Sequence, residues 1–493
     1  MPGIRWVLLS FLASATGMAA QQPGQPLLDS VGLAMGGVDR ILAVRTLLLE
    51  GTGNEFRLGQ NATPEAELPR YAVTAYRRAT DFANRRWALD LTRVPRFVTG
   101  NLAAQRQRTA YDAVAFDLLP DTTARGTTAR RSTARADADR ADELLYHPIG
   151  FLQIALAPGA ELTEEEPRDG LRHVRMNAAG FKFSILVDPR TKLPARIERV
   201  VYHPVLGDVV LETRFADWRA VDGLRLPMRI SQRLDGRWTL SDIHVATARV
   251  DAELGDLSAP PDVLESEPLE PAVTVESEEI APGVWYLTGQ SHHSVVIEMD
   301  DHLILVEAPQ SDARTLAVIA RARALRPAKP LRTVINTHHH FDHAGGLRAA
   351  IAEGLTVITH EKNRLFVDSL ARRQHFIVAD ALAARPQAAH IESAGERQVL
   401  THGTRTVEIH HISGSAHAET LLMVYLPTER LLIEADAYTP PPADVTPPPP
   451  TPFAANLLAN IDRLGLRVER IVPLHGRVVS ISALRAATAA GKP

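Results

Sequence analysis

One segment constrains the chain more than any other: Thr337-His338-His339-His340-Phe341-Asp342-His343-Ala344-Gly345-Gly346. It follows an apolar stretch typical of a strand and opens a predicted helix. Because side chains alternate in direction along an extended segment, His338 and His340 are expected to point the same way. Asp342 and His343 then stand at the turn into the helix, where they can face a second metal. A surface run of histidines does not usually follow the carboxyl end of a strand with an aspartate at this spacing, so the segment predicts a metal site.

Composition limits how such a site can be built. The chain of 493 residues contains no cysteine, which excludes disulfides, cysteine-based zinc fingers, iron–sulfur clusters and thiol catalysis. A metal must therefore be held by histidines and carboxylates. The 54 Lys and Arg residues against 58 Asp and Glu give a net charge of −4. Nucleic-acid binding needs a positive surface, so that class is not expected.

The first 20 residues have the pattern of a secretory signal peptide. Arg5 precedes a short apolar run, Val7–Ala15, and small residues precede Gln21. The run is too short for a stable membrane span. Cleavage after Ala19 or Ala20 would place the mature protein in the periplasm or outside the cell, and a buried N-terminal helix is the alternative.

Residues 21–268 are expected to form a β-rich N-terminal domain with one large antiparallel sheet. Turn signals such as Asp188-Pro189 and Asp222-Gly223 separate its alternating runs. The Ala-, Arg- and Thr-rich stretch Asp121–Arg140 is expected to lead into a helix near Ala141–Leu145. The expected strands are Thr46–Gly51, Tyr71–Ala79, Arg86–Leu91, Lys182–Val187, Ala195–Tyr202, Asp208–Phe215 and Leu224–Arg233.

This succession of strands, with Val221–Pro227 near its end, resembles the half-barrel sheets of outer-membrane lipoprotein carriers. The resemblance implies a concave face that could hold a lipid or an acyl group. No catalytic constellation is identifiable in this region. Its single histidines are expected to be structural or surface residues; they are His147, His173, His203 and His244.

A boundary is predicted at Leu257–Pro271, where proline and acidic residues indicate an extended linker. Residues 269–493 then form a second domain in which strands and helices alternate. The expected strands are Ser294–Glu298, Leu303–Glu307, Leu331–Asn336, Thr356–Thr359, Arg405–Ile412, Thr420–Leu426, Leu431–Ala435 and Ile471–Leu474, and the expected helices are Ala313–Leu325, Ala344–Ala352 and Phe453–Leu464.

The histidine segment matches His-x-His-x-Asp-His and so resembles the signature of the metallo-β-lactamase fold superfamily. The resemblance predicts three further ligands, and His417, Asp436 and His475 each stand at the end of a predicted strand. Ala435 replaces the glycine that usually precedes the aspartate in this superfamily. Order and spacing agree from about residue 275 to the end. The resemblance implies a four-layer αβ/βα sandwich for the second domain, and the whole chain is then of the α+β class.

The resemblance also implies two Zn²⁺ ions, with other divalent metals as alternatives. One set of ligands would be His338, His340 and His417, the other would be Asp342, His343 and His475, and Asp436 would bridge both ions. Imidazole and carboxylate groups suit zinc. Two Zn²⁺, two carboxylates and one bridging hydroxide leave a net charge of about +1, which favours an anionic transition state.

The candidate catalytic residues are Asp342 and Tyr438. Tyr438 follows the bridging aspartate closely and could hydrogen-bond a substrate carbonyl oxygen, with packing as the alternative. His292 and His293 lie in a loop that could contact substrate, whereas His339 must point away from the metals. The proline-rich run 439–452 is expected to be an extended spacer or one wall of the cleft.

These features predict an exported dinuclear zinc-dependent hydrolase. A hydroxide held between the metals would attack the carbonyl of an ester, a lactone, a thioester or a β-lactam. A small-molecule substrate is expected, together with a possible lipid or acyl ligand of the N-terminal domain and no integral membrane span. The alternative is a cell-envelope protein that binds a lipid or acyl group, in which the metal domain is structural or vestigial.

Overall fold

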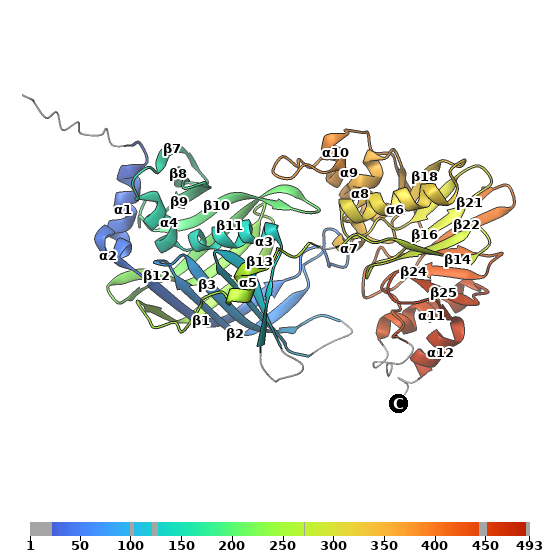
Figure 1. The fold of residues 1–493 in the computed structure, drawn as a ribbon, viewed down its shortest axis with the longest axis horizontal. Helices are drawn as coiled ribbons and strands as arrows, with labels where there is room; N and C mark the ends of the chain where they lie inside the picture. The colour runs from blue at the N-terminus through green and yellow to red at the C-terminus, as the bar shows by residue number, and fades with distance from the viewer. Residues whose placement is uncertain (1–21, 99–102, 121–126, 271, 443–450, 490–493) are drawn as a thin grey trace, which may run out of the picture.

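The computed structural model describes residues 22–98, 103–120, 127–270, 272–442 and 451–489. These residues form two bodies that follow each other along the chain (Figure 1). The predicted signal peptide lies outside the described residues. Among the described residues, none of the helices has the length and apolar character needed to cross a membrane.

The N-terminal body is built on one sheet of 13 strands, in which each strand is antiparallel to its neighbours. The order is β6-β5-β4-β3-β2-β1-β13-β12-β11-β10-β9-β8-β7, so the first and last strands of the region meet in the middle. The strands are β1 (Thr46–Phe56), β2 (Arg70–Asp81), β3 (Arg86–Pro95), β4 (Gln105–Asp112), β5 (Val114–Pro120), β6 (Thr127–Arg131), β7 (Glu161–Arg168), β8 (Leu171–Ala178), β9 (Phe181–Val187), β10 (Pro194–His203), β11 (Gly207–Val221), β12 (Leu224–Leu234) and β13 (Trp238–Val250). The large antiparallel sheet predicted from the sequence is confirmed.

Helices pack on one face of this sheet and close its main core. They are α1 (Gln25–Met35), α2 (Val38–Ala43), α3 (Ala134–Asp142), the 3₁₀ turn η1 (Glu143–Tyr146) and α4 (Pro148–Ala155). Leu28, Ile149 and Phe151 are fully buried against strand residues such as Trp87 and Val174. Removing this much apolar surface from water is the main favourable contribution to the stability of the domain.

Two sequence expectations for this region need correction. The helix expected near Ala141–Leu145 starts earlier, at Ala134, because the Thr133 side chain accepts a hydrogen bond from the Ala136 N–H and caps the helix there. The predicted linker is not a free extended segment. Its short helix α5 (Pro261–Glu265) buries Val263 against the sheet.

The C-terminal body contains two sheets, with orders β14-β15-β16-β17-β18-β19-β20 and β21-β22-β23-β24-β25-β26. The strands of the first are β14 (Glu276–Ala281), β15 (Val284–Thr288), β16 (Ser294–Glu298), β17 (Leu303–Val306), β18 (Leu331–Ile335), β19 (Thr356–His360) and β20 (Ile391–Ala394). Those of the second are β21 (Arg397–His402), β22 (Arg405–His411), β23 (Leu422–Leu426), β24 (Leu431–Glu434), β25 (Arg470–Pro473) and β26 (Val479–Ser480). The helices are α6 (Asp312–Leu325), α7 (Phe341–Ala344), α8 (Leu347–Ala352), η2 (Glu361–Asn363), α9 (Arg364–Arg372), α10 (Ala381–Ala384), α11 (Pro452–Leu464) and α12 (Ile481–Ala489).

These elements form four layers. One apolar cluster lies between the two sheets and joins residues such as Val306 and Ile433. A second cluster packs the first sheet against α6 and α8, and a third packs the second sheet against α11 and α12. The four-layer sandwich expected for this region is therefore present.

The histidine segment lies at the junction of the two bodies, where Figure 1 places α7. The single helix expected over Ala344–Ala352 is divided into α7 and α8 at Gly345-Gly346. A side chain on Gly346 would collide with the Thr315 hydroxyl of α6, so glycine allows α6 to approach the segment closely.

Candidate metal centre

Four chain segments bring their side chains to one edge of the sandwich. The histidine segment follows β18, His417 lies in the loop between β22 and β23, Asp436 follows β24, and His475 follows β25. The ligand atoms of His338, His340, His417 and Asp436 lie within 4.8 Å of one another. Segments far apart in the sequence thus meet where their strands end.

The proton on His340 is placed by a neighbour from the other domain. Its Nε2 lies 3.0 Å from the backbone carbonyl oxygen of Asn61. A carbonyl oxygen can only accept, so Nε2 carries the proton and Nδ1 keeps its lone pair. Nδ1 is buried and has no hydrogen-bond partner among the described residues. A buried, unpartnered lone pair of this kind is suited to a metal ion.

His338 and His343 are oriented in the same way by a buried pair, Thr337 and Glu307. The Thr337 hydroxyl donates to the Glu307 carboxylate, so its oxygen can accept from His338 Nδ1 at 3.1 Å. His343 Nδ1 donates to Glu307 Oε2 at 3.0 Å. Both rings therefore turn the lone pair of Nε2 toward the centre.

The inward nitrogens face one another at short range. His475 Nδ1 donates to the Ser291 carbonyl oxygen at 3.1 Å, and its Nε2 lies 3.1 Å from His343 Nε2. His417 Nε2 lies 3.3 Å from His338 Nε2. Two lone pairs at this distance repel each other unless a proton or a metal ion lies between them.

Asp436 lies at the centre of these nitrogens. Its Oδ2 is 3.3 Å from His338 Nε2, 3.1 Å from His343 Nε2 and 2.9 Å from His417 Nε2, and its Oδ1 is 2.9 Å from His475 Nε2. Its backbone adopts φ 53°, a left-handed conformation that aspartate tolerates better than most residues. One carboxylate thus reaches both groups of histidines.

The electrostatics of the centre favour positive charge. Burial alone raises the pKa of Asp436, but the facing histidines, His343 first, hold it well below its ordinary value. Burial lowers the pKa of His343, yet Asp436 and Glu307 together raise it well above its ordinary value. The donor set and this demand for positive charge both fit divalent metal ions.

Glu307 was not identified from the sequence, although it holds much of this arrangement. Its side chain is fully buried and also accepts from the Asn336 amide at 3.0 Å and from the Thr337 N–H at 3.3 Å. Its backbone φ of 77° turns the chain directly after β17. An acidic residue at the end of an apolar strand was the available signal.

Asp342 was expected to join His343 and His475, but the structure groups those two histidines with His292, and Asp342 lies beside His292. Its Oδ2 is 3.3 Å from His292 Nε2, and its Oδ1 accepts from Gln60 Nε2 at 2.8 Å. Burial opposes ionisation of Asp342, but the His292 hydrogen bond and the charge of His343 lower its pKa. Ligand atoms of His292, His343 and His475 lie within 4.8 Å of one another. His292 therefore borders the second group of ligands, next to Asp342.

The N-terminal domain reaches this centre through the loop 57–69 between β1 and β2. Besides Gln60 and Asn61, the loop accepts a backbone hydrogen bond from Phe341 N–H at the Gly59 carbonyl, at 3.2 Å. Gly59 has φ 73°, and a side chain there would collide with the Phe341 ring. Only glycine combines this backbone conformation with so close an approach. No local sequence signal connected this loop with a segment about 280 positions later.

Other predicted site residues lie apart from the ligands. The ring of Tyr438 packs against the apolar cluster beneath α11 and α12, and its backbone N–H donates to Glu434 at 3.1 Å. This placement corresponds to the packing alternative. His339 Nδ1 lies 3.1 Å from the Thr420 hydroxyl, and His293 contacts the Tyr286 hydroxyl. Of the proline-rich run, residues 443–450 lie outside the described residues.

Comparison with known proteins agrees with this geometry. Residues 287–475 match the family model of the metallo-beta-lactamase superfamily. A curated relative, "2,4-dinitroanisole O-demethylase subunit alpha" of a Nocardioides species, is 24% identical over 197 residues, which cover 39% of this chain and 54% of the relative. The match thus spans about half the length of that relative.

Solved structures of metallo-beta-lactamases cover the same part of the chain. The enzyme from Pontibacter korlensis is 16% identical and covers 44% of this chain and 98% of its own, with a TM-score of 0.35. The enzyme from Hirschia baltica is 19% identical, covers 44% of this chain and 98% of its own, and has a TM-score of 0.34.

Replacing a central side chain should remove metal. We expect His338→Ala and Asp436→Ala to retain fewer than about one divalent ion per chain after dialysis against zinc, because each removes a donor from the shared centre. Metal content is measured by mass spectrometry of the folded proteins. His390→Ala, at an exposed histidine, is the control and should bind as much metal as the parent. Unchanged metal content in Asp436→Ala would contradict the assignment.

Removing the N-terminal contact should weaken one metal site more than the other. We expect Gln60→Ala to weaken binding of one of the two ions by about tenfold, because Asp342 loses the amide that holds its Oδ1. Competition with a metal-binding dye measures the affinity of each site. Gln107→Ala, at an exposed glutamine of the same domain, is the control. Equal affinities in the parent and both variants would show that the loop contact has no such effect.

Proposed function

We propose that this chain is a metal-dependent hydrolase whose C-terminal domain holds two divalent ions, with zinc as the expected metal. The observation that carries the proposal is the set of histidine lone pairs that point at one another and at Asp436. Such an arrangement is costly inside a protein unless cations occupy it. The superfamily match of residues 287–475 supports the same proposal.

Seven side chains would share the two ions. His338, His340 and His417 would serve one ion, and Asp436, which lies among them, also reaches His475 with its Oδ1. His343 and His475 would serve the other ion, together with Asp342, which lies beside His292 of the same group. When bound, the ions supply Lewis acidity toward a carbonyl oxygen and a nucleophile at neutral pH. We assign hydrolysis of an ester, lactone, thioester or β-lactam on this basis.

The residues of the chain itself prepare the centre for this chemistry. Glu307 keeps a proton on Nδ1 of His343, so that the opposite nitrogen stays available inside the centre. Gln60 and His292 donate to the two oxygens of Asp342 and fix its carboxylate in the ionised form. Its Oδ2 therefore stays an ionised acceptor beside the second group of ligands.

Export is a further part of the proposal, and it rests on sequence alone. The signal-like residues 1–20 support export, and with it a periplasmic or secreted location.

An acyl ligand of the N-terminal domain is a separate proposal that depends on a cavity in that domain. The competing function, a lipid-binding protein with a vestigial metal domain, is less well supported, because acceptors orient the rings of His340, His343 and His475.

Turnover of a defined bond tests the proposal. The mature chain loaded with zinc is assayed against chromogenic β-lactam, lactone, thioester, ester and phosphodiester substrates, with 2,4-dinitroanisole added because a relative bears that name. We expect turnover of one carbonyl class, and a loss of at least about 100-fold in kcat/KM in His338→Ala and Asp436→Ala. His390→Ala should retain full activity. A folded protein that holds two ions but turns over none of these carbonyl substrates would contradict the assigned chemistry.

A further inference from the structure

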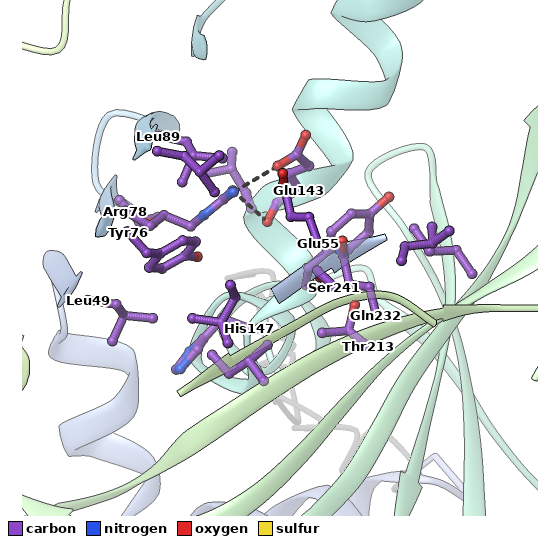
Figure 2. A pocket seen from close by; sticks show the side chains of 18 of the residues that line it. Leu49, Glu55, Tyr76, Arg78, Leu89, Glu143, His147, Thr213, Gln232 and Ser241 are labelled. Atoms are coloured by element: carbon purple, nitrogen blue, oxygen red, sulfur yellow. Dashed lines mark hydrogen bonds and ion pairs between the residues drawn. The ribbon is translucent and has the colours of Figure 1, made fainter. Parts of the chain in front are cut away.

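A second candidate site lies in the N-terminal domain, away from the metal centre. A cavity of about 440 Å³ separates the sheet from the helical segment that carries Glu143 and His147 (Figure 2). This volume falls within the roughly 300–1,000 Å³ typical of small-molecule sites. The cavity shares no lining residue with the metal centre. One lining residue, Tyr202, lies 6.0 Å from the His375 ring of the C-terminal domain, so this end of the cavity is close to the domain junction.

One part of the cavity wall is aliphatic. Leucine side chains from β1 and β3 line it, including Leu49 and Leu89, and Ile230 of β12 and Ile243 of β13 continue the same surface. Figure 2 shows Leu49 and Leu89 on the side of Tyr76. An apolar ligand segment would be removed from water here, which is favourable in proportion to the area buried.

Another part of the cavity wall carries hydrogen-bonding groups that have no partner among the described residues. The side chains of Tyr76, Tyr146 and Tyr202 have no hydrogen-bond partner among the described residues, nor does that of Thr213, which is only 2% exposed. His147 Nδ1 accepts from the Ile149 N–H, so Nε2 carries a proton, and this nitrogen is buried without a partner. These donors border the cavity, so a bound molecule with acceptor oxygens would satisfy them.

The charges at the cavity select against an ionic ligand. Arg78 is the one arginine or lysine among the lining residues, and it is paired with Glu143 at 2.8 Å and stacked on Trp87. Burial lowers the pKa of His147 to about 3, so its ring is neutral at physiological pH. The other lining carboxylates are also paired, Glu55 with Arg93 at 2.9 Å and Asp139 with Arg135 at 2.9 Å. An anionic head group would find no free cation here and would face three carboxylates.

We propose that this cavity binds an uncharged single-chain acyl compound. The chain lies on the aliphatic wall, and the carbonyl of its ester or amide group accepts hydrogen bonds from the tyrosine hydroxyls. The site is independent of the proposed hydrolase activity, since none of its residues touches the candidate metal ligands.

Calorimetric titration of the mature full-length chain tests the proposal. The probes are 1-monolauroylglycerol, laurate and dodecyltrimethylammonium, each below its micelle-forming concentration and each titrated into metal-loaded and metal-depleted protein. We expect the neutral ester to bind at least about tenfold more tightly than either charged probe, with or without metal, because burying a charge is costly. Equal or tighter binding of laurate would overturn the neutral selectivity, and binding of none of the probes would overturn the site.

Two variants, Ile230→Trp and Tyr76→Phe, test whether the ester binds in the cavity. Ile230→Trp fills it and should weaken binding of the ester at least about tenfold. Ser231→Trp is the matched control on the next residue of β12, which is not part of the lining, and should leave binding unchanged. Tyr76→Phe keeps the ring, tests the hydroxyl without filling space, and should weaken binding about three- to tenfold. The assignment would be overturned if a folded Ile230→Trp protein bound the ester as tightly as the parent. If Ile230→Trp does not fold, parent-like binding by Tyr76→Phe would overturn it instead.

Discussion

Buried imidazole nitrogens that face one another impose the strongest constraint on this structure. His343 Nε2 and His475 Nε2 are 3.1 Å apart, and carbonyl or carboxylate acceptors fix the proton of each ring on its outer nitrogen. In a site shielded from water, that arrangement is stable only with positive charge at its centre. The strand ends, the buried Glu307 and the left-handed backbone at Asp436 are all required to hold these groups in place.

The same constraint links the two domains. His340 depends on the Asn61 carbonyl for its orientation, and Asp342 depends on the Gln60 amide, although both partners belong to a loop of the N-terminal domain. Without this loop, His340 Nε2 and Asp342 Oδ1 would lose these hydrogen-bond partners. In this chain the centre is completed by a loop whose Gly59 lies directly against Phe341. The N-terminal domain is therefore part of the site as well as a candidate binding module.

The histidine segment could be predicted from sequence because its geometry is local, whereas His417, Asp436 and His475 were predicted from the resemblance to the superfamily. The spacing from His338 to His343 fixes the segment's position at one strand end, and His417, Asp436 and His475 each follow an apolar run. Gln60, Asn61 and Glu307 could not be identified, since their roles depend on contacts between distant segments. Polar strands such as β4 and β6 were missed for a related reason: their pairing in the sheet, rather than their own hydrophobic pattern, makes them strands. Long aliphatic runs such as β16 and β24 carried their own signal and were predicted correctly.

The central claim is that these converging side chains hold two metal ions. Anomalous X-ray diffraction at the zinc edge, from crystals of the zinc-loaded full chain, tests it most directly. We expect two peaks about 3.5–4 Å apart, one among His338, His340 and His417, the other beside His343 and His475, with Asp436 between them. A fully zinc-equilibrated crystal with one peak or none at this position would contradict it.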